Sequence, residues 1–127
     1  MFNLRYDHIH LRAIDIEGMA AWFRDTLGAE ITARTSAGKP RVDLNLGGTP
    51  VFITESDPTD LEGPAGLNKG IDHFGFAVDD LAGAVAALKA KGVEFTMEPT
   101  SPRPGITISF IRGPENISIE LLERSKA

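Results

Sequence analysis

Polar and apolar side chains alternate along residues 8–13, and apolar residues at helical spacing follow them. A period of two predicts a strand with one buried face, whereas spacings of three and four predict a helix. Asp15 suits the N-cap of this helix, which we expect to run to about Leu27, and Gly28 suits its end. Three further strands are expected near residues 30–35, 41–46 and 51–55. The first half of the chain is therefore predicted to be β-α-β-β-β.

The second half of the chain repeats the first. A shift of 65 residues places Asp7-His8 on Asp72-His73 and Asp15 on Asp80. No single match is specific, but their order, with one deletion, indicates two copies of one module. The second copy predicts a helix to about Lys91 and strands near residues 73–78, 94–98, 106–111 and 117–122. The predicted fold is α+β, with two βαβββ modules forming a cupped mixed sheet and helices on its outer face.

The repeat also sets the expected boundaries. We expect a single domain over residues 1–127, with module one at about 5–56 and module two at about 71–124. Residues 57–70 are rich in Pro, Gly and Asp and lack periodicity, which is typical of a connector between modules.

Alternation predicts a polar face on the strands of each module. We expect the opposite, apolar face to pack on the helices, and to include Ile106, Ile108 and Phe110. The polar face is expected to contain His8, His10, Arg12, Arg41, Asp43, Asn45, Thr107, Ser109, Ser118 and Glu120. A polar sheet face commonly faces solvent and nothing more. Here the face gathers ligand-type residues at repeat-related positions, which favours a site inside the cup.

Composition narrows the range of functions. The chain has 127 residues, 42% of them hydrophobic, and no cysteine, which excludes disulfides, thiolate metal sites and cysteine nucleophiles. The net charge of −5 without a basic stripe argues against a nucleic-acid partner. No apolar run approaches 20 residues, so no membrane helix is expected. We expect a cytoplasmic protein, because the lack of cysteine is compatible with a reducing compartment.

Several motifs together resemble one known family. The module openings at residues 7–12 and 72–80 resemble those of the vicinal oxygen chelate superfamily, which contains glyoxalases, bleomycin-resistance proteins and extradiol dioxygenases. Residues 22–28 resemble the end of its first helix, and residues 112–121 resemble its final turn and strand. The ordered set covers nearly the whole chain. It points to the superfamily and to no single reaction.

The resemblance implies a metal site. In that superfamily the ligands come from the first and last strands of each module, and the matching positions here are His8, His73 and Glu120. Two imidazoles and one carboxylate suit a divalent ion such as Fe, Zn, Mn, Ni or Co. The fourth family position falls on Phe52, which cannot bind a metal, unless a constant offset places Glu55 there instead. A single histidine on a strand is more often a structural residue than a metal ligand. The repeat relation between His8 and His73 favours the interpretation that both bind a metal.

Other residues of the polar face are candidates for binding and proton transfer. His10 is a candidate general acid or base, and three other roles are open: an alternative metal ligand, a supporting partner beside the metal, and a purely structural residue. Arg12 and Arg41 suit a substrate carboxylate or phosphate, with pairing to nearby acids as the alternative. The remaining expected substrate contacts are Phe52, Asn45 and Ser109.

The resemblance further implies a metal-dependent enzyme acting on a small molecule with adjacent oxygens, through lyase or isomerase chemistry by way of an enediolate. An extradiol-type Fe(II) dioxygenase is one alternative. A metal-free binding protein like the bleomycin-resistance members is another. The family also suggests a homodimer, in which the modules pair within one chain or are exchanged between two chains.

Overall fold

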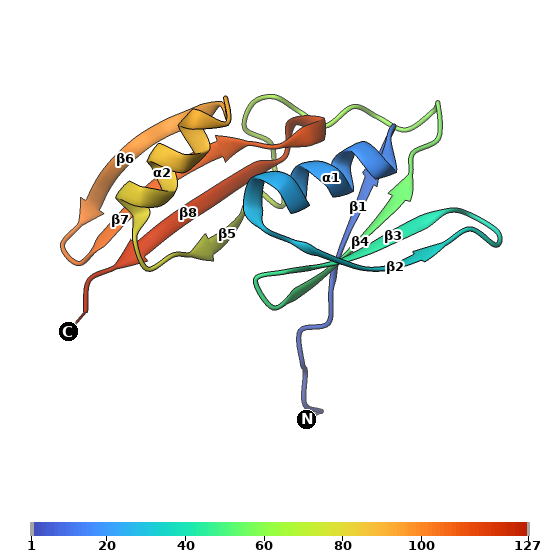
Figure 1. The fold of residues 1–127 in the computed structure, drawn as a ribbon, viewed down its shortest axis with the longest axis horizontal. Helices are drawn as coiled ribbons and strands as arrows, with labels where there is room; N and C mark the ends of the chain where they lie inside the picture. Colours follow the sequence, from blue (N-terminus) through green and yellow to red (C-terminus); the bar gives the residue numbers. More distant parts are fainter. Residues whose placement is uncertain (1, 127) are drawn as a thin grey trace. The chain divides into compact units, whose positions relative to one another are not determined.

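A computed structural model describes residues 2–126 of the chain. The backbone divides into two compact units, one ending at Leu61 and the other beginning at Glu62. Each unit contains one α-helix and one four-stranded mixed sheet (Figure 1). The predicted α+β class and the βαβββ order of each half are therefore confirmed.

The first unit begins with β1 (Ile9–Ala13) and α1 (Ile16–Leu27). It continues with β2 (Glu30–Thr35), β3 (Arg41–Leu46) and β4 (Thr49–Glu55). The order across the sheet is β1-β4-β3-β2. Strand β1 runs parallel to β4, and the other neighbours are antiparallel. Figure 1 shows α1 along one face of this sheet, where it contacts all four strands.

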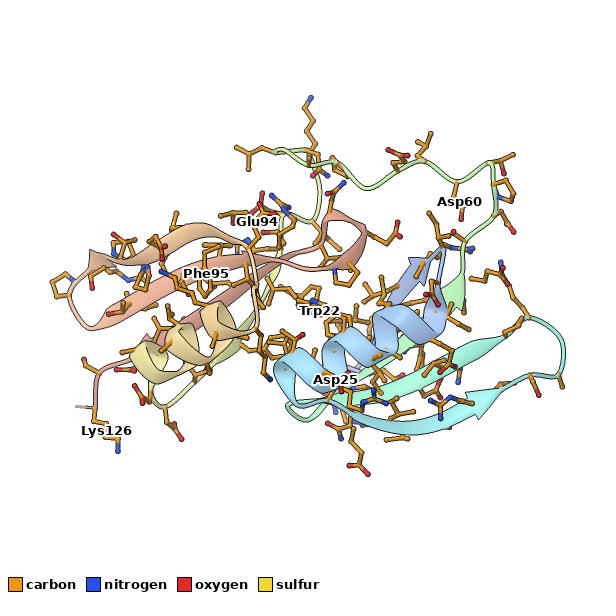
Figure 2. All side chains as sticks on the ribbon, turned by 45° about the horizontal axis from the view of Figure 1, so that its top comes forward. Trp22, Asp25, Asp60, Glu94, Phe95 and Lys126 are labelled. Atoms are coloured by element: carbon orange, nitrogen blue, oxygen red, sulfur yellow. The ribbon has the colours of Figure 1, made fainter. Side chains whose placement is uncertain are left out.

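The ends of α1 follow the capping signals of the sequence. The Asp15 carboxylate accepts a hydrogen bond from the Gly18 backbone N–H at 2.9 Å, which satisfies one of the free donors at the helix start. Gly28 has a φ of 75°, the left-handed conformation in which glycine pays no Cβ penalty. The helix buries Met19 and Phe23, whereas Trp22, labelled in Figure 2, is only half-buried.

The second unit repeats the same topology. It contains β5 (Phe74–Ala77), α2 (Leu81–Ala90), β6 (Phe95–Arg103), β7 (Ile106–Arg112), a short 3₁₀ turn η1 (Pro114–Asn116) and β8 (Ser118–Arg124). The sheet order is β5-β8-β7-β6, with β5 parallel to β8. Asp80 caps α2 through the Gly83 backbone N–H at 3.0 Å, as Asp15 caps α1.

The faces of the first sheet are those that alternation predicts. Val42 pairs with Ile53 and Leu44 with Val51, and all four side chains are buried. The opposite face contains the polar residues of β1 and β3, because the register pairs His10 with Phe52, Asp43 with Phe52, and Arg12 and Arg41 with Thr54. Burial of the apolar row against α1 therefore fixes the polar row on the other side.

The second sheet differs from the prediction on β7. The register pairs Phe110 with Glu120 and Ile108 with Leu122, so these apolar residues share the face of Glu120. Ser109 instead pairs with Leu121 and is buried on the helix side. The prediction that Ile106, Ile108 and Phe110 pack on the helix, with Ser109 opposite, is wrong. Alternation along β7 predicts that successive side chains point to opposite faces of the sheet. It does not predict which of the two faces packs on the helix, because that depends on the pairing of β7 with β8.

The connector is fastened to the second unit at the η1 turn. The Asn116 side-chain amide donates to the Gly63 carbonyl at 2.8 Å, and the Arg112 guanidinium donates to the Ala65 carbonyl at 3.2 Å. Glu115 and Asn116 both have positive φ, 56° and 59°. This stretch of the connector therefore has a defined course along the turn.

The helices found in residues 2–126 are all too short or too polar to cross a membrane.

Candidate functional site

His73 and Glu120 come together in the second unit. His73 lies directly before β5, and Glu120 lies on β8, the strand paired with β5. The His73 Nε2 atom is 3.6 Å from the Glu120 Oε1 atom. The Phe110 ring packs edge-on against the imidazole, with ring centroids 4.7 Å apart. A nitrogen donor and a carboxylate oxygen thus lie side by side, as two of the three predicted ligands require.

Gly75 leaves room for the Glu120 side chain. The two residues are partners in the β5–β8 pair, and a Cβ added at Gly75 would lie 3.0 Å from Glu120 Oε1 and 3.3 Å from its Cβ. A larger residue would push the carboxylate from its position beside His73. The glycine therefore helps to place the carboxylate.

His8 occupies the corresponding position in the first unit. It lies directly before β1, and its ring packs on the ring of Phe52, with centroids 4.4 Å apart and planes at 32°. The guanidinium carbon of Arg41 is 4.2 Å from the Phe52 ring centroid. Phe52 is thus in contact with an imidazole and a cation.

The strand register supports the alignment that places Phe52 opposite Glu120. Phe52 is the partner of His10 in the β1–β4 pair, and Glu120 is the partner of Gly75 in the β5–β8 pair. His10 and Gly75 stand two residues after His8 and His73, so the two partners are equivalent. Glu55, the alternative fourth ligand, pairs with Ala13 and lies on the opposite face from Phe52.

His10 is held by its own hydrogen bond. Its Nε2 atom is 2.7 Å from the Thr54 hydroxyl oxygen. Partial burial lowers the pKa of His10 below 6.5, and the positive charge of Arg12 lowers it further. The neutral ring is therefore favoured at neutral pH, a state that can accept or pass on a proton.

The two arginines on the polar face both have carboxylate neighbours. Arg41 lies against Asp43, with Nε 2.7 Å from one carboxylate oxygen and Nη2 3.0 Å from the other. Arg12 Nη1 is 3.7 Å from an oxygen of Asp60, which is labelled in Figure 2. Arg41 is therefore strongly engaged, whereas the contact of Arg12 is looser and half-exposed.

Two other expected substrate contacts are placed differently. The Asn45 side-chain oxygen accepts from the Gly48 backbone N–H at 2.8 Å, so it closes the turn between β3 and β4. Ser109 is fully buried on the helix side of its sheet, which removes it from the face of Glu120. Its hydroxyl has no hydrogen-bond partner within residues 2–126.

The residues of the proposed ligand set fit a divalent metal chemically. Imidazole nitrogen and carboxylate oxygen are donors that Zn, Mn, Fe, Ni and Co accept. The second unit provides the His73–Glu120 pair, and the first unit provides His8. In the part of the chain that the structure describes, no group of three His, Asp or Glu side chains is arranged to hold an ion.

The sequence reasoning missed three residues that touch His8 or His73. The Asp7 and Asp72 carboxylates contact the Nδ1 atoms of His8 and His73, and Phe110 packs on His73. The repeated Asp-His dipeptide was a usable signal for the two aspartates. Phe110 gave no such signal, because its face depended on the register of β7.

Comparisons with known proteins place these observations in a family. The family model of the Glyoxalase/Bleomycin resistance protein/Dioxygenase superfamily matches residues 5–121. A probable chloroplastic lactoylglutathione lyase of Arabidopsis thaliana is 46% identical over 59 residues, which are 46% of this chain and 17% of that protein. An ethylmalonyl-CoA/methylmalonyl-CoA epimerase of Cereibacter sphaeroides is 33% identical over 101 residues, 69% of this chain and 71% of the epimerase.

A solved structure shows the same fold. The fosfomycin resistance protein FosX from Listeria monocytogenes, complexed with Mn(II) and sulfate, superimposes with a TM-score of 0.73. The match covers 98% of this chain and 95% of the FosX chain, at 18% sequence identity. At that identity the likeness concerns the fold.

Proposed function

Because this chain belongs to the Glyoxalase/Bleomycin resistance protein/Dioxygenase superfamily, we propose that it is a metal-dependent lyase or isomerase for a small substrate with vicinal oxygens. The observation that carries the proposal is the His73–Glu120 pair, with Nε2 and Oε1 3.6 Å apart. The likeness to a lactoylglutathione lyase and to an epimerase supports the reaction class.

The proposed ligands are His73, Glu120 and His8, with His8 supplied by the same chain or by a second copy in a homodimer. The Mn(II) in the FosX complex supports a divalent ion, to be identified among Fe, Zn, Mn, Ni and Co. When bound, such an ion polarises the oxygens of a substrate and stabilises the negative charge that develops on them. A set of three protein ligands would leave the ion open to an oxygen of the substrate.

The neighbouring residues are assigned to binding and proton transfer. His10, whose pKa is lowered by burial and by Arg12, is the proposed general base, and its Thr54 contact orients the ring. Arg12 is the proposed contact for an anionic group of the substrate, since its ion pair at 3.7 Å is loose. Arg41 and Phe52, which contact each other, are the further proposed substrate contacts.

The test is the metal content of the purified protein. We expect the parent chain, prepared without chelators, to retain bound divalent metal, measured by elemental analysis. His73→Ala and Glu120→Ala are expected to lose it, whereas the matched control His10→Gln is expected to keep it, because His10 bonds to Thr54. A parent free of metal, or a His73→Ala variant with undiminished metal, would contradict the proposal.

A metal-free binding protein is the second candidate. It is favoured by the apolar residues on the face of Glu120, namely Ile108, Phe110 and Leu122, which suit an apolar ligand. A parent chain that lacks metal but shows saturable binding of a hydrophobic dye, reduced in Phe110→Ala, would favour this function over the enzyme.

A further inference from the structure

The two proposed histidine ligands share a contact. The Nδ1 atom of His8 is 2.6 Å from an oxygen of Asp7, and the Nδ1 atom of His73 is 2.7 Å from an oxygen of Asp72. A contact between neighbours in sequence can arise once by chance. Here it occurs in both compact units, at the same position directly before the first strand. His10, which lacks a preceding aspartate, is bonded through Nε2 instead.

The contact determines where the ring proton lies. An ionised carboxylate only accepts hydrogen bonds, so Asp72 favours a proton on Nδ1 of His73. In the neutral ring the free lone pair is then on Nε2, the atom that faces Glu120. Glu120 would favour the opposite tautomer, because it attracts a proton on Nε2. Asp72 lies 2.7 Å from Nδ1, within hydrogen-bond distance, whereas Glu120 lies 3.6 Å from Nε2. The tautomer with the proton on Nδ1 is therefore favoured.

The carboxylates of Asp72 and Glu120 differ in their exposure to solvent. The side chain of Asp72 is 50% exposed, that of His73 is 30% exposed and that of Glu120 is 17% exposed. An ion pair as exposed as Asp72–His73 contributes little to folding stability. Its repetition in both units therefore points away from stability and toward the orientation of the imidazole.

We propose that Asp72 and Asp7 are positioning residues that hold His73 and His8 with a proton on Nδ1 and a free lone pair on Nε2. The inference rests on the proposed function, in which these histidines bind a divalent metal. A metal-binding histidine whose other nitrogen donates to a carboxylate is oriented and made more basic, and loss of that carboxylate lowers metal affinity by about 10- to 100-fold.

The first experiment needs no metal. The full chain, labelled with ¹⁵N, is treated with a chelator and studied by imidazole ¹⁵N–¹H correlation spectra at about pH 9, above the ordinary range of imidazole titration. We expect the Nδ1–H tautomer for His73 in the parent and a shift toward Nε2–H in Asp72→Ala. Asp72→Asn keeps an acceptor oxygen and should retain the parent tautomer in part. Asp79→Ala, an exposed aspartate of the same segment, is the matched control.

The second experiment measures Zn²⁺ affinity by calorimetry on the same four proteins. We expect Asp72→Ala to bind Zn²⁺ about 10- to 100-fold more weakly than the parent, with Asp72→Asn between them and Asp79→Ala unchanged. Asp7→Ala should have the corresponding effect through His8.

The two experiments separate the inference from the proposed function. An unchanged His73 tautomer in Asp72→Ala, or an affinity no weaker than that of Asp79→Ala, would overturn the positioning role. A parent chain that binds none of Zn²⁺, Mn²⁺, Fe²⁺, Ni²⁺ and Co²⁺ would overturn the proposed function, and the tautomer of His73 would then decide the inference alone.

Discussion

Phe52 decides how many ligands the first unit can offer. It stands at the position equivalent to Glu120, in contact with the ring of His8. We predict that Phe52→Glu places a carboxylate beside His8 and strengthens Zn²⁺ binding by on the order of tenfold or more, because it adds a charged ligand. Phe52→Gln is the matched control of equal length, and calorimetry is the measurement. Equal affinities in the two variants would show that position 52 does not reach the ion.

The buried hydroxyl of Ser109 is a second point at the scale of one residue. It has no partner within residues 2–126, and an unpaired buried polar group costs about 1–3 kcal/mol. We therefore predict that Ser109→Ala leaves the free energy of unfolding unchanged or raises it by about 1 kcal/mol. Urea denaturation measures this change, with the half-buried Ser118→Ala as control. A loss of stability of more than about 1 kcal/mol would mean that the hydroxyl is hydrogen-bonded.

At the scale of elements, α1 and β2 are joined by the pair of Glu17 and Arg34, whose atoms approach to 3.0 Å. The hydrogen bond from Arg34 lowers the pKa of Glu17 below 4.5 in the folded chain. The charged pair therefore stabilises the fold at pH values above the unfolded pKa, and this contribution is lost as the pH falls through the folded pKa.

The direction of this pH dependence gives a direct test of the ion pair between Glu17 and Arg34. We predict that Glu17→Gln lowers the urea midpoint at neutral pH, and that the difference from the parent disappears as the pH falls well below 4.5. Glu30→Gln, on an exposed position of β2, controls for the loss of one negative charge. A difference that is the same at acid and neutral pH would contradict the assignment.

The connector gives another prediction at this scale. A Cβ at Gly63 would lie 2.5 Å from the Glu115 carbonyl oxygen, whereas nothing lies within 4 Å of a Cβ at Gly66. We predict that Gly63→Ala lowers the free energy of unfolding by about 1–3 kcal/mol, because the η1 turn or the connector must shift. Gly66→Ala, measured by the same urea denaturation, should change it little. Equal stability of the two variants would show that the connector is not packed on the turn.

Patterns among neighbouring residues were enough to predict the helices and strands, but not which face of each strand is buried. The Asp15 and Asp80 caps and the alternation of β1 and β3 each involve a few neighbouring residues, and the structure follows them. Strand β7 is apolar on both sides, with Phe110 on one row and Ile111 on the other. Its orientation is decided by pairing with β8, a contact that alternation alone does not encode.

At the scale of the whole molecule, the candidate site was predicted from the repeat and the family resemblance together. The repeat related His73 to His8, and the resemblance implied Glu120, which lies 3.6 Å from His73 in the structure. The contacts of Asp7 and Asp72 depend on side-chain rotamers, and the sequence therefore indicated only that the dipeptide recurs.

The final prediction concerns the coupling of metal binding to folding. A ligand that binds only the folded chain raises the free energy of unfolding by about 2.7 kcal/mol at 100 times its dissociation constant. We predict a gain of this size for the parent with Zn²⁺, measured by urea denaturation. The gain should fall in His8→Ala and disappear in His73→Ala at the same Zn²⁺ concentration, whereas His10→Gln should keep it. Because His8 belongs to the first unit and His73 to the second, a gain that depends on both histidines requires both modules to supply ligands. An undiminished gain in His8→Ala would remove His8 from the ligand set and leave the His73–Glu120 pair as the protein's contribution.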